Sequence, residues 1–528
     1  MPISDAEPSL HTGRTANTVA AQHVREIPRD RNPFPTAGIR RDSSGVRYYD
    51  PLPATLLEML AARVDDHPDS EAIVELGGGR MTYRQLWDRA ARVAGGLRAA
   101  GLAAGDRVAV RYPAGLNWVL AFWGTVMAGG IATLVNTRAD RSEADFVLTD
   151  ADARVNLTPD TPLPDGARYV TDRLTATDTA ALFYTSGTTG RPKGVPTTHQ
   201  AFLTAAENGA RSVALPAGAE LRTLISVPLF HVTGCCPQLL GAAYLGGAAV
   251  IMPTLNVDAL VHALAGERIS FLVSVPAIYS LLLRHKAFAG SDVSGVRWVG
   301  YGGAPIAPPL VGRLKGAFPV AEAFNGYGMT ETASLLTVLP DAEAVNYADS
   351  VGYAVPSVDL GILPFGDDPT VGELVARGAN VTAGYWNQPQ ATAETIIDGW
   401  LRTGDVVRID AAGRVYVIDR LKDIINRGGE NVSSVEVEAV LGSAPNVADA
   451  CVLAVPDDVM GEKVGAVLFG GRQDIDVSAV IDYCSNHLSD YKIPQYVTVV
   501  SDPLPRNAAG KLLKSRLRQQ VRWGAALR

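Results

Sequence analysis

Apolar and polar residues alternate along most of the chain with two different periods. From Thr82 towards Gly101 the apolar residues recur at helical spacing, which predicts an amphipathic helix. Short apolar runs predict buried strands at 107–111, 131–135, 180–184, 223–227, 248–252, 271–275 and 296–300. The last four runs are separated from one another by segments of helical length. Strands that alternate with helices in this way indicate parallel sheets covered by helices, and therefore an α/β protein.

One apolar stretch is long enough to raise the question of a membrane span. Residues 118–135 contain no charged side chain over 18 positions, which is close to the length that crosses a bilayer. Gly129 and Gly130 divide the stretch into a segment of helical length, 118–128, and one of strand length. We therefore expect a buried helix followed by a buried parallel strand, and no membrane span.

The pattern changes from about Ser350 onward, where short strands and turns replace the alternation. Short runs at 372–377 and 413–418 predict strands in this region. Beyond Arg420 the sequence predicts a smaller unit with a helix near 434–441, a strand at 448–455, a helix near 477–488 and a basic C-terminal helix. Residues 1–45 are expected to be largely irregular. A chain of 528 residues is too long for one core, so two to four domains are expected.

The composition excludes several classes of protein. Apolar residues make up 47% and charged residues 19% of the chain, as in folded soluble proteins. The net charge of −8 argues against a nucleic-acid-binding protein, which normally has a basic surface. The four cysteines have no CxxC spacing and indicate neither a zinc site nor a disulfide framework. The first 45 residues lack the apolar segment of a signal peptide, so we expect a cytoplasmic protein.

The strongest local signal is the loop 184–195, which reads Tyr-Thr-Ser-Gly-Thr-Thr-Gly-Arg-Pro-Lys-Gly-Val and follows a predicted buried strand. Its glycines, Gly187, Gly190 and Gly194, let the backbone approach a ligand closely. Its hydroxyls and Lys193 suit the oxygens of a polyphosphate. The spacing differs from that of the P-loop of kinases and GTPases, because Gly194 follows the lysine. The loop predicts a nucleotide-phosphate site, and a flexible surface loop is the alternative.

Four further motifs follow this loop in order along the chain. They are Asn325–Thr332 (NGYGMTET), Trp400–Asp405 (WLRTGD), Asp419–Asp423 (DRLKD) and Leu504–Lys511 (LPRNAAGK). Together with the loop, these motifs resemble the adenylate-forming superfamily, which includes acyl-CoA synthetases, peptide-synthetase adenylation domains and firefly luciferase. The resemblance covers roughly residues 50–515 and is greatest to fatty-acid–CoA ligases.

The resemblance implies a fold and a reaction. It implies a large N-terminal domain at 46–419, with two βαβ-type sheets and a distorted β-barrel, a hinge at 420–423, and a small mobile α+β domain at 424–528. In the implied reaction, a carboxylic acid attacks the α-phosphate of ATP and gives an acyl-adenylate and pyrophosphate. The small domain then rotates, and a thiol displaces AMP to give a thioester.

The resemblance also implies which residues bind ATP. The β- and γ-phosphates are expected at the loop residues Thr185, Ser186, Gly187, Thr188, Thr189, Gly190 and Lys193. The ring of Tyr327 is expected on one face of the adenine. The opposite wall and the rest of the motif strand would be formed by Gly302, Gly303, Ala304, Pro305, Gly326, Gly328 and Met329. Asn325 would pair with the amino edge of the adenine.

The remaining nucleotide contacts concern the ribose, the α-phosphate and the metal. Asp405 offers two acceptors to the ribose diol and Arg420 adds a donor, although a simple turn residue after Gly404 is the alternative for Asp405. Thr330 would place its hydroxyl at the α-phosphate. Glu331 is expected to bind Mg²⁺ as a hard oxygen ligand, with Thr188 as a second ligand.

Lys511 is the expected catalytic lysine of adenylation. The attacking carboxylate and the α-phosphate are both anions, and a cation between them stabilises the transition state. A solvated lysine in a glycine loop is the alternative for this residue. Lys422 matches the hinge position, where backbone torsions absorb a domain rotation. Gly428 and Gly429 match the loop that leaves a channel for the pantetheine arm of the thiol.

His231 bears on the identity of the acid. It occupies the position at which relatives that activate amino acids usually carry an aspartate for the substrate ammonium, so its presence favours a fatty or aryl acid that lies against the imidazole. A histidine of the core is the alternative interpretation. We also find no extra segment around 350–372 of the kind that marks many fatty acyl-AMP ligases, which favours CoA as the thiol.

Three hypotheses follow. The leading one is an ATP- and Mg²⁺-dependent ligase that joins a medium- or long-chain fatty acid, or a related apolar acid, to coenzyme A. The second is a ligase that loads the acid onto the phosphopantetheine of an acyl or peptidyl carrier protein. The basic C-terminus could contact either the CoA phosphates or an acidic carrier protein, and a solvated helix face is the alternative. The third is a non-catalytic nucleotide-binding protein. We expect no nucleic-acid partner, and either a monomer or a homodimer.

Overall fold

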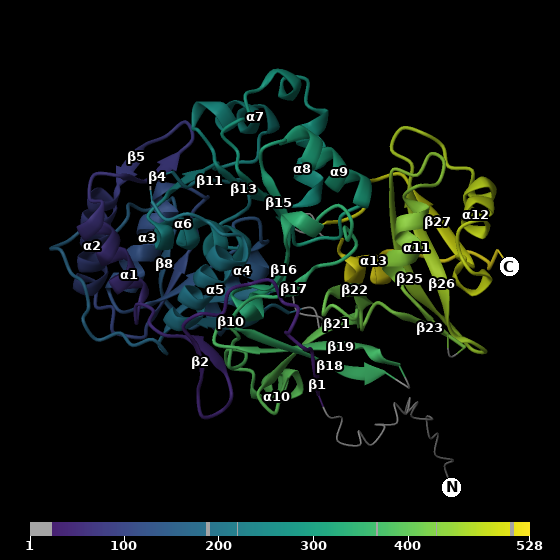
Figure 1. The fold of residues 1–528 in the computed structure, drawn as a ribbon, viewed down its shortest axis with the longest axis horizontal. Coiled ribbons are helices and arrows are strands. Elements are labelled where there is room, and N and C mark those ends of the chain that lie inside the picture. Colours follow the sequence, from purple (N-terminus) through teal and green to yellow (C-terminus); the bar gives the residue numbers. More distant parts are fainter. Residues whose placement is uncertain are drawn as a thin grey trace, which may run out of the picture.

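Three sheets of nine, six and five strands and a five-stranded C-terminal sheet carry the fold (Figure 1). The computed structural model describes residues 24–185, 191–218, 220–365, 368–428, 430–506 and 512–527. Several residues predicted to form the site lie outside these ranges, namely Ser186, Gly187, Thr188, Thr189, Gly190, Gly429 and Lys511. Their roles stay predictions.

The five-stranded sheet contains, in order, β10 (Lys193–Thr198), β9 (Thr179–Thr185), β7 (Ile131–Leu134), β6 (Arg107–Val110) and β8 (Ala153–Leu157). Its strands are parallel except for β10, which pairs with β9 in the antiparallel direction. The strands predicted at 107–111, 131–135 and 180–184 are confirmed. Helix α3 (Leu116–Met127) precedes β7 as expected, and none of the helices in the described part of the chain is long and apolar enough to cross a membrane.

The nine-stranded sheet contains, in order, β17 (Tyr353–Ala354), β16 (Ser334–Leu339), β15 (Glu322–Met329), β14 (Trp298–Gly302), β13 (Phe271–Ser274), β11 (Arg222–Ile225), β12 (Ala248–Ile251), β4 (Glu71–Glu75) and β5 (Arg80–Thr82). The strands from β15 to β4 are parallel to one another, and the strands at both edges are antiparallel. The four strands predicted between 223 and 300 all belong to this parallel part. Ligand sites of open parallel sheets lie beyond the carboxyl ends of the strands.

Helices cover both faces of the nine-stranded sheet. One core joins Ile251 of this sheet and Phe183 of the five-stranded sheet through helices α1 (Leu56–Asp66), α2 (Tyr83–Ala99), α3, α5 (His199–Ser212) and α6 (Gly241–Leu245). A second core on the opposite face joins Val250 to α7 (Val257–Gly266), α8 (Pro276–Arg284) and α9 (Pro308–Ala317). Val250 and Ile251 are neighbours that face different cores, as the alternation of side chains along a strand requires. Helix α4 (Arg141–Asp150) packs against β8 of the five-stranded sheet.

The third large sheet is antiparallel and corresponds to the predicted distorted barrel. It contains β1 (Arg25–Glu26), β18 (Val358–Phe365), β19 (Asp368–Gly378), β21 (Trp400–Ile409) and β20 (Ile396–Ile397) in that order, with β22 (Val415–Arg420) paired to β21. Helix α10 (Pro389–Thr395) precedes β20. Strands β1 and β2 (Ile39–Arg41), the second paired with β3 (Arg47–Tyr49), lie inside the segment 1–45 that we expect to be largely irregular. They are too short to show a period in the sequence.

The C-terminal unit lies at one end of the molecule (Figure 1). Its sheet contains β24 (Glu430–Val432), β23 (Ile425–Arg427), β26 (Gly461–Phe469) and β25 (Asp449–Asp457), with β27 (Tyr496–Val500) paired to β26. Its helices are α11 (Ser434–Leu441), α12 (Val477–Ser485) and α13 (Lys514–Gln520). The predicted fold class, two βαβ-type sheets with a barrel-like sheet and a small α+β unit, is confirmed. The domain limits 46–419, 420–423 and 424–528 stay predictions.

Candidate active site

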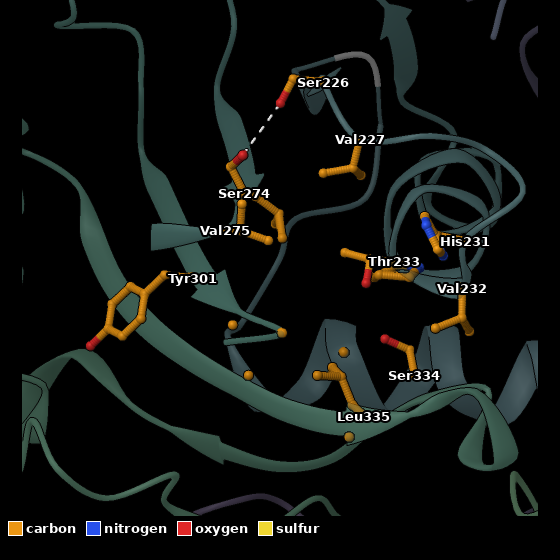
Figure 2. A pocket seen from close by; sticks show the side chains of 18 of the residues that line it. Ser226, Val227, His231, Val232, Thr233, Ser274, Val275, Tyr301, Ser334 and Leu335 are labelled. Carbon is orange, nitrogen blue, oxygen red and sulfur yellow. Dashed lines mark hydrogen bonds between the residues drawn. The ribbon is translucent and has the colours of Figure 1, made fainter. Parts of the chain in front are cut away.

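A cavity of about 420 Å³ lies along one face of the nine-stranded sheet and reaches the carboxyl ends of β13, β14 and β15 (Figure 2). Figure 2 shows His231 and Thr233 on one side of this cavity and Val275 on the other. The predicted site residues that line it are Gly302, Gly303, Gly326, Gly328, Met329, Thr330 and His231. The motif of β15 and the preceding strand therefore meet at one cavity, although they are far apart in the sequence.

Two glycines are needed where strands approach each other closely. A Cβ atom on Gly302 would collide with the carbonyl oxygen of Gly326 on the neighbouring strand. A Cβ atom on Gly328 would collide with the carbonyl oxygen of Ser334. These positions of the motif serve the packing of β14, β15 and β16, and they also leave the cavity wall without side chains. Ala304 and Pro305 follow in an exposed loop before α9.

Tyr327 of β15, Asp405 and Arg420 form a polar cluster in which Asp405 is buried and the other two residues are half-buried. The Tyr327 hydroxyl donates to Oδ2 of Asp405 over 2.6 Å, and Nε of Arg420 lies 2.6 Å from Oδ1 of the same carboxylate. Asp405 and Arg420 are paired in register across β21 and β22. Burial, together with the charge of Asp405, raises the pKa of Tyr327 well above its usual range. Each carboxylate oxygen keeps a further lone pair that can accept a hydrogen bond from a ligand hydroxyl.

Asn325 is buried one strand position before Gly326. Its side-chain Nδ2 donates to the carbonyl oxygen of Ser350 over 3.2 Å, which fixes the direction of the amide. Asn325 does not line the cavity among the residues that the structure describes. Its contact with an adenine stays a prediction.

Tyr385, which the sequence analysis did not identify, connects Glu331 to Lys193. The Tyr385 hydroxyl donates to Oε1 of Glu331 over 2.9 Å. The Nζ atom of Lys193 lies 4.7 Å from the centre of the Tyr385 ring, within the range of a cation–π interaction. Lys193 begins β10 and is paired in register with Thr185, the last residue of β9. The two ends of the glycine-rich loop are thus held together beside Glu331.

The segment around Tyr385 is fastened to both neighbours by its backbone. The N–H of Trp386 donates to the carbonyl oxygen of Gly194 over 2.8 Å, and the N–H of Thr382 donates to that of Glu331 over 2.8 Å. Glu331 is buried in the short turn Thr330–Thr332. A signal for this role exists in the sequence, because Tyr385 and Trp386 are large aromatic residues in a segment of small and polar ones.

The donor set around Glu331 fits a magnesium ion held together with phosphates. Mg²⁺ is usually bound by one or two carboxylates and by phosphate oxygens of the substrate. Glu331 supplies one carboxylate, and the described residues contain no group of three or more His, Cys, Asp or Glu side chains that could hold a metal without such a ligand. The predicted second ligand, Thr188, lies outside the described ranges.

His231 lies at the start of the π-helix η1 (Gly234–Leu240) and lines the cavity. Its carbonyl oxygen accepts from the N–H of Cys235 over 3.1 Å, whereas its ring Nε2 is buried and has no hydrogen-bond partner among the described residues. Burial, with a smaller contribution from the charge of Arg138, lowers the pKa of His231 to about 4. The imidazole is therefore neutral near pH 7 and can donate or accept one hydrogen bond to a group in the cavity.

Lys422 and Gly428 are not part of the cavity lining in the described part of the chain. The carbonyl oxygen of Lys422 accepts from Arg518 over 3.4 Å. Gly428 has φ +62° and its N–H donates to the carbonyl oxygen of Met460 over 2.7 Å. Their roles as hinge and channel residues stay predictions. The four cysteines are buried and free, as the sequence indicates.

A glycine-lined cavity at the ends of parallel strands, with a buried carboxylate cluster and a lysine beside a glutamate, defines a nucleotide-binding α/β enzyme. The sequence model described as "AMP-binding enzyme" matches residues 60–173 and 162–386, and the one described as "AMP-binding enzyme C-terminal domain" matches residues 436–511. The chain belongs to the AMP-binding enzyme family, and the predicted superfamily is confirmed. As a member of this family it is an AMP-forming acid–thiol ligase.

Relatives with printed activities cover nearly the whole chain. A long-chain-fatty-acid–CoA ligase of Mycobacterium tuberculosis is 33% identical over 498 residues, which covers 88% of this chain and 97% of that protein. A feruloyl-CoA synthase of an Amycolatopsis species is 34% identical over 492 residues, covering 87% and 97%. The structure of an O-succinylbenzoate coenzyme A synthetase from Bacillus subtilis in complex with ATP and magnesium ion has a TM-score of 0.80 at 29% identity, covering 87% and 99%.

Proposed function

We propose that this ligase activates a medium- or long-chain fatty acid, or a related apolar acid, with ATP and transfers the acyl group to coenzyme A. The observation that carries the proposal is the wall of the cavity. Small residues of α5 (Ala205, Ala206, Gly209 and Ala210) face Phe271 and Val273 of β13 across it. An acid whose tail is apolar gains about 0.8 kcal/mol for each methylene that it buries in such a wall.

The chain's own residues have distinct tasks in this proposal. Glu331 holds the bound Mg²⁺, whose charge neutralises part of the triphosphate. Lys193 and Thr185 hold the outer phosphates, and the buried carboxylate of Asp405 accepts from the ribose hydroxyls. Since Tyr385 donates to Oε1 of Glu331, it would keep this carboxylate oxygen in place and leave the other oxygen available to a bound Mg²⁺.

The acid is placed by the opposite part of the cavity. Thr330 and His231 both line it, so the carboxylate of the acid is expected beside them, with the tail along α5. The neutral imidazole of His231 can donate to a carboxylate oxygen without a change of protonation near pH 7. The cavity wall excludes water from the acyl group, and Lys511, carried by the small domain, is the expected cation between the two reacting anions.

Coenzyme A is preferred over a carrier protein as the acceptor. Two basic residues of the C-terminal helix α13 are already engaged inside the chain, because Lys514 pairs with Glu438 at 2.8 Å and Arg518 pairs with Asp423 at 2.6 Å. These two are therefore part of the small unit itself and do not form a surface for an acidic carrier protein. The relatives named above are also described as acting on CoA.

The test is a panel of acids offered with ATP and Mg²⁺ to the purified protein. Saturated acids of different length and aromatic acids such as ferulic acid are compared by acid-dependent exchange of labelled pyrophosphate into ATP, and thioester is scored separately on CoA and on a purified carrier protein. We expect exchange and acyl-CoA with straight-chain acids. Exchange confined to aromatic acids would overturn the acid class, and thioester found only on the carrier protein would overturn the acceptor.

A further inference from the structure

The acid cavity ends at a wall near the amino ends of the parallel strands. Phe271 begins β13 and Phe324 lies near the start of β15, and both line this end of the cavity together with Val213, Leu215 and Leu245. The opposite end reaches Met329 and Thr330. The cavity therefore runs along the strand direction, from the predicted nucleotide side to an apolar end.

A second cavity of about 310 Å³ lies behind this wall. Among the described residues, Val213 and Phe324 are the two that line both cavities. Both side chains are buried, and the Phe324 ring is stacked on Phe271 with ring centres 6.1 Å apart and planes 11° apart. Two side chains therefore separate the two spaces.

The second cavity is covered on its far side by the N-terminal segment, which contributes Pro33, Phe34 and Pro35. This cover is held in place by hydrogen bonds. Nδ2 of Asn32 donates to the carbonyl oxygen of Ala354 over 2.7 Å, and the guanidinium of Arg29 donates to the carbonyl oxygens of Val355 and Pro356 over 3.2 Å and 3.1 Å. Phe34 belongs to the same hydrophobic core as Phe324 and Val213.

Two of the three charged residues that line the second cavity, Asp341 and Arg211, are engaged elsewhere, and the third, Glu322, is exposed. Asp341 forms an ion pair with Lys315 and accepts from the N–H of Ala323 over 2.7 Å. Arg211 pairs with Glu207 at 2.6 Å. With these groups satisfied, the space between the prolines, Phe34 and the wall is suited to an alkyl chain.

We propose that Phe324, supported by Val213, is the residue that sets the length of the acid, and that the second cavity receives the far end of an alkyl chain once this wall is made smaller. The inference rests on the proposed function, because it assumes an alkyl acid in the first cavity. Phe324, as the specificity-determining residue, and the second cavity, as the binding space, both lie away from the reacting atoms.

The length of the cavity gives an expected limit. Five residue steps separate Met329 from Phe324 along β15, which corresponds to about 17 Å. An extended chain advances about 1.2 Å per bond, since an extended peptide residue of about 3.5 Å contains three bonds. A straight acid of about 14 carbons would therefore bring its last carbon to Phe324.

Binding measurements test the wall without the need for turnover. Saturated acids of increasing length are titrated calorimetrically into the intact protein. In the wild type we expect the Kd to fall about fourfold per added methylene, and to stop falling near the limit above. Phe324→Leu is the first variant and Val213→Ala the second. In both, we expect the acid length at which the Kd stops falling to increase by at least about two carbons.

A double variant tests whether the added carbons enter the second cavity. Ser212 lines that cavity, and its buried hydroxyl has no hydrogen-bond partner among the described residues. Ser212→Leu therefore fills the space without the loss of a bond, and Phe324→Leu combined with Ser212→Leu should return the limit to that of the wild type. Phe318→Leu is the matched control, because Phe318 is a buried aromatic residue that lines neither cavity.

The outcomes separate the inference from the proposed function. If the acid length at which the Kd stops falling is unchanged in both Phe324→Leu and Val213→Ala, these residues do not limit the length of the acid. An equal shift of this length in Phe318→Leu leads to the same conclusion. A longer limit that survives Ser212→Leu overturns the second cavity as the receiving space, and a wild type that binds none of the acids overturns the inference as a whole. If the limit shifts as expected but no acyl-CoA forms from these acids, the proposed function fails and the wall stands.

Discussion

At the scale of single residues, Tyr385 connects two charged groups, Glu331 and Lys193, that are predicted to bind Mg²⁺ and phosphate. Its hydroxyl donates to Glu331 and its ring lies beside the ammonium of Lys193. Burial, followed by the charge of Glu331, raises the pKa of Tyr385 far above its usual range, so the hydroxyl remains a donor at all pH values of interest. The carboxylate of Glu331 is thereby oriented by a neighbouring hydroxyl.

Replacement of Tyr385 by Phe isolates the contribution of this hydroxyl. Phe keeps the ring beside Lys193 and removes only the hydrogen bond to Glu331. Hydrogen bonds to charged groups are stronger than those between neutral groups. We therefore expect acid-dependent pyrophosphate exchange to fall about tenfold in this variant. The Mg²⁺ concentration for half-maximal exchange should rise. The measurement is exchange as a function of Mg²⁺ at fixed ATP.

The matched control is Tyr353→Phe. Tyr353 also donates to a glutamate, since its hydroxyl lies 3.0 Å from Oε1 of Glu343, but it does not line the cavity in the described part of the chain. We expect the Mg²⁺ requirement of this variant to equal that of the wild type. Equal changes in both variants would mean that Tyr385 acts through general stability and not through Glu331.

The sequence predicts which residues meet in the structure where the backbone leaves a mark within one motif. Gly302, Gly328 and Lys193 stand in short motifs with unusual glycine content, and the structure places them at or beside one cavity. Tyr385 stands out in the sequence only as one of two large aromatic residues in a segment of small and polar ones, and its partner Glu331 is 54 positions away. Hydrogen-bond partners of this kind are set by the fold and cannot be read from a local pattern.

At the scale of elements, two helix starts are joined by a histidine. The ring Nδ1 of His199, the first residue of α5, accepts from the N–H of Leu56, the first residue of α1, over 3.2 Å. This N–H is one of those that a helix leaves without a partner in its own first turn. Burial lowers the pKa of His199 to about 4, although the charge of Asp178 acts in the opposite direction. The neutral ring is the form that accepts this hydrogen bond.

The lowered pKa predicts a loss of stability in mild acid. Between pH 6.5 and pH 4 the unfolded chain binds a proton at this histidine while the folded chain does not, so the free energy of unfolding falls as the pH decreases through this window. The contribution of His199 to this loss is about 2 kcal/mol between pH 7.5 and pH 5. His231, whose pKa is also lowered to about 4 by burial, adds a loss of the same sign.

His199→Asn tests this account by urea denaturation at pH 7.5 and pH 5. The side-chain oxygen of asparagine can accept from Leu56 N–H, and it does not bind a proton in this range. We expect the variant to be nearly as stable as the wild type at pH 7.5 and to lose less stability at pH 5. His262→Asn is the control, because His262 lies on the surface. The same dependence on pH in His199→Asn and in the wild type would contradict the prediction.

Element types are predicted better than their ends. The run 296–300 indicates a strand, yet β14 comprises Trp298–Gly302. The N–H of Val296 donates to the carbonyl oxygen of Val293, so Val296 belongs to a turn and not to the strand. At the other end, Tyr301 and Gly302 pair with Asn325 and Gly326, which extends the strand. Hydrophobicity alone does not report this pairing, because Gly302 has no side chain.

At the scale of the whole molecule, the end of the small unit is anchored to the predicted hinge. Arg518 of α13 pairs with Asp423 at 2.6 Å, and the carboxylate of Asp419 accepts from the hydroxyl of Ser434 over 2.7 Å. Lys514 of α13 also donates to the hydroxyl of Ser434, over 2.6 Å. Arg506 and Leu512, the described residues that flank the segment containing Lys511, form an isolated bridge. Any rotation of the small unit about the hinge would therefore carry these two residues with it.

Lys511→Ala should separate the two half-reactions. If the small unit delivers this ammonium between the carboxylate and the α-phosphate, its loss should slow adenylation about a hundredfold or more, measured by pyrophosphate exchange. Formation of thioester from a supplied acyl-adenylate and CoA should remain within about threefold of the wild type, because that step proceeds without the repulsion between the two anions. Lys463→Ala is the matched control, since Lys463 lies in the same unit and pairs with Asp457 at 2.7 Å. An equal loss of both half-reactions in Lys511→Ala would show that this lysine serves the structure of the small unit and not the chemistry of the first step.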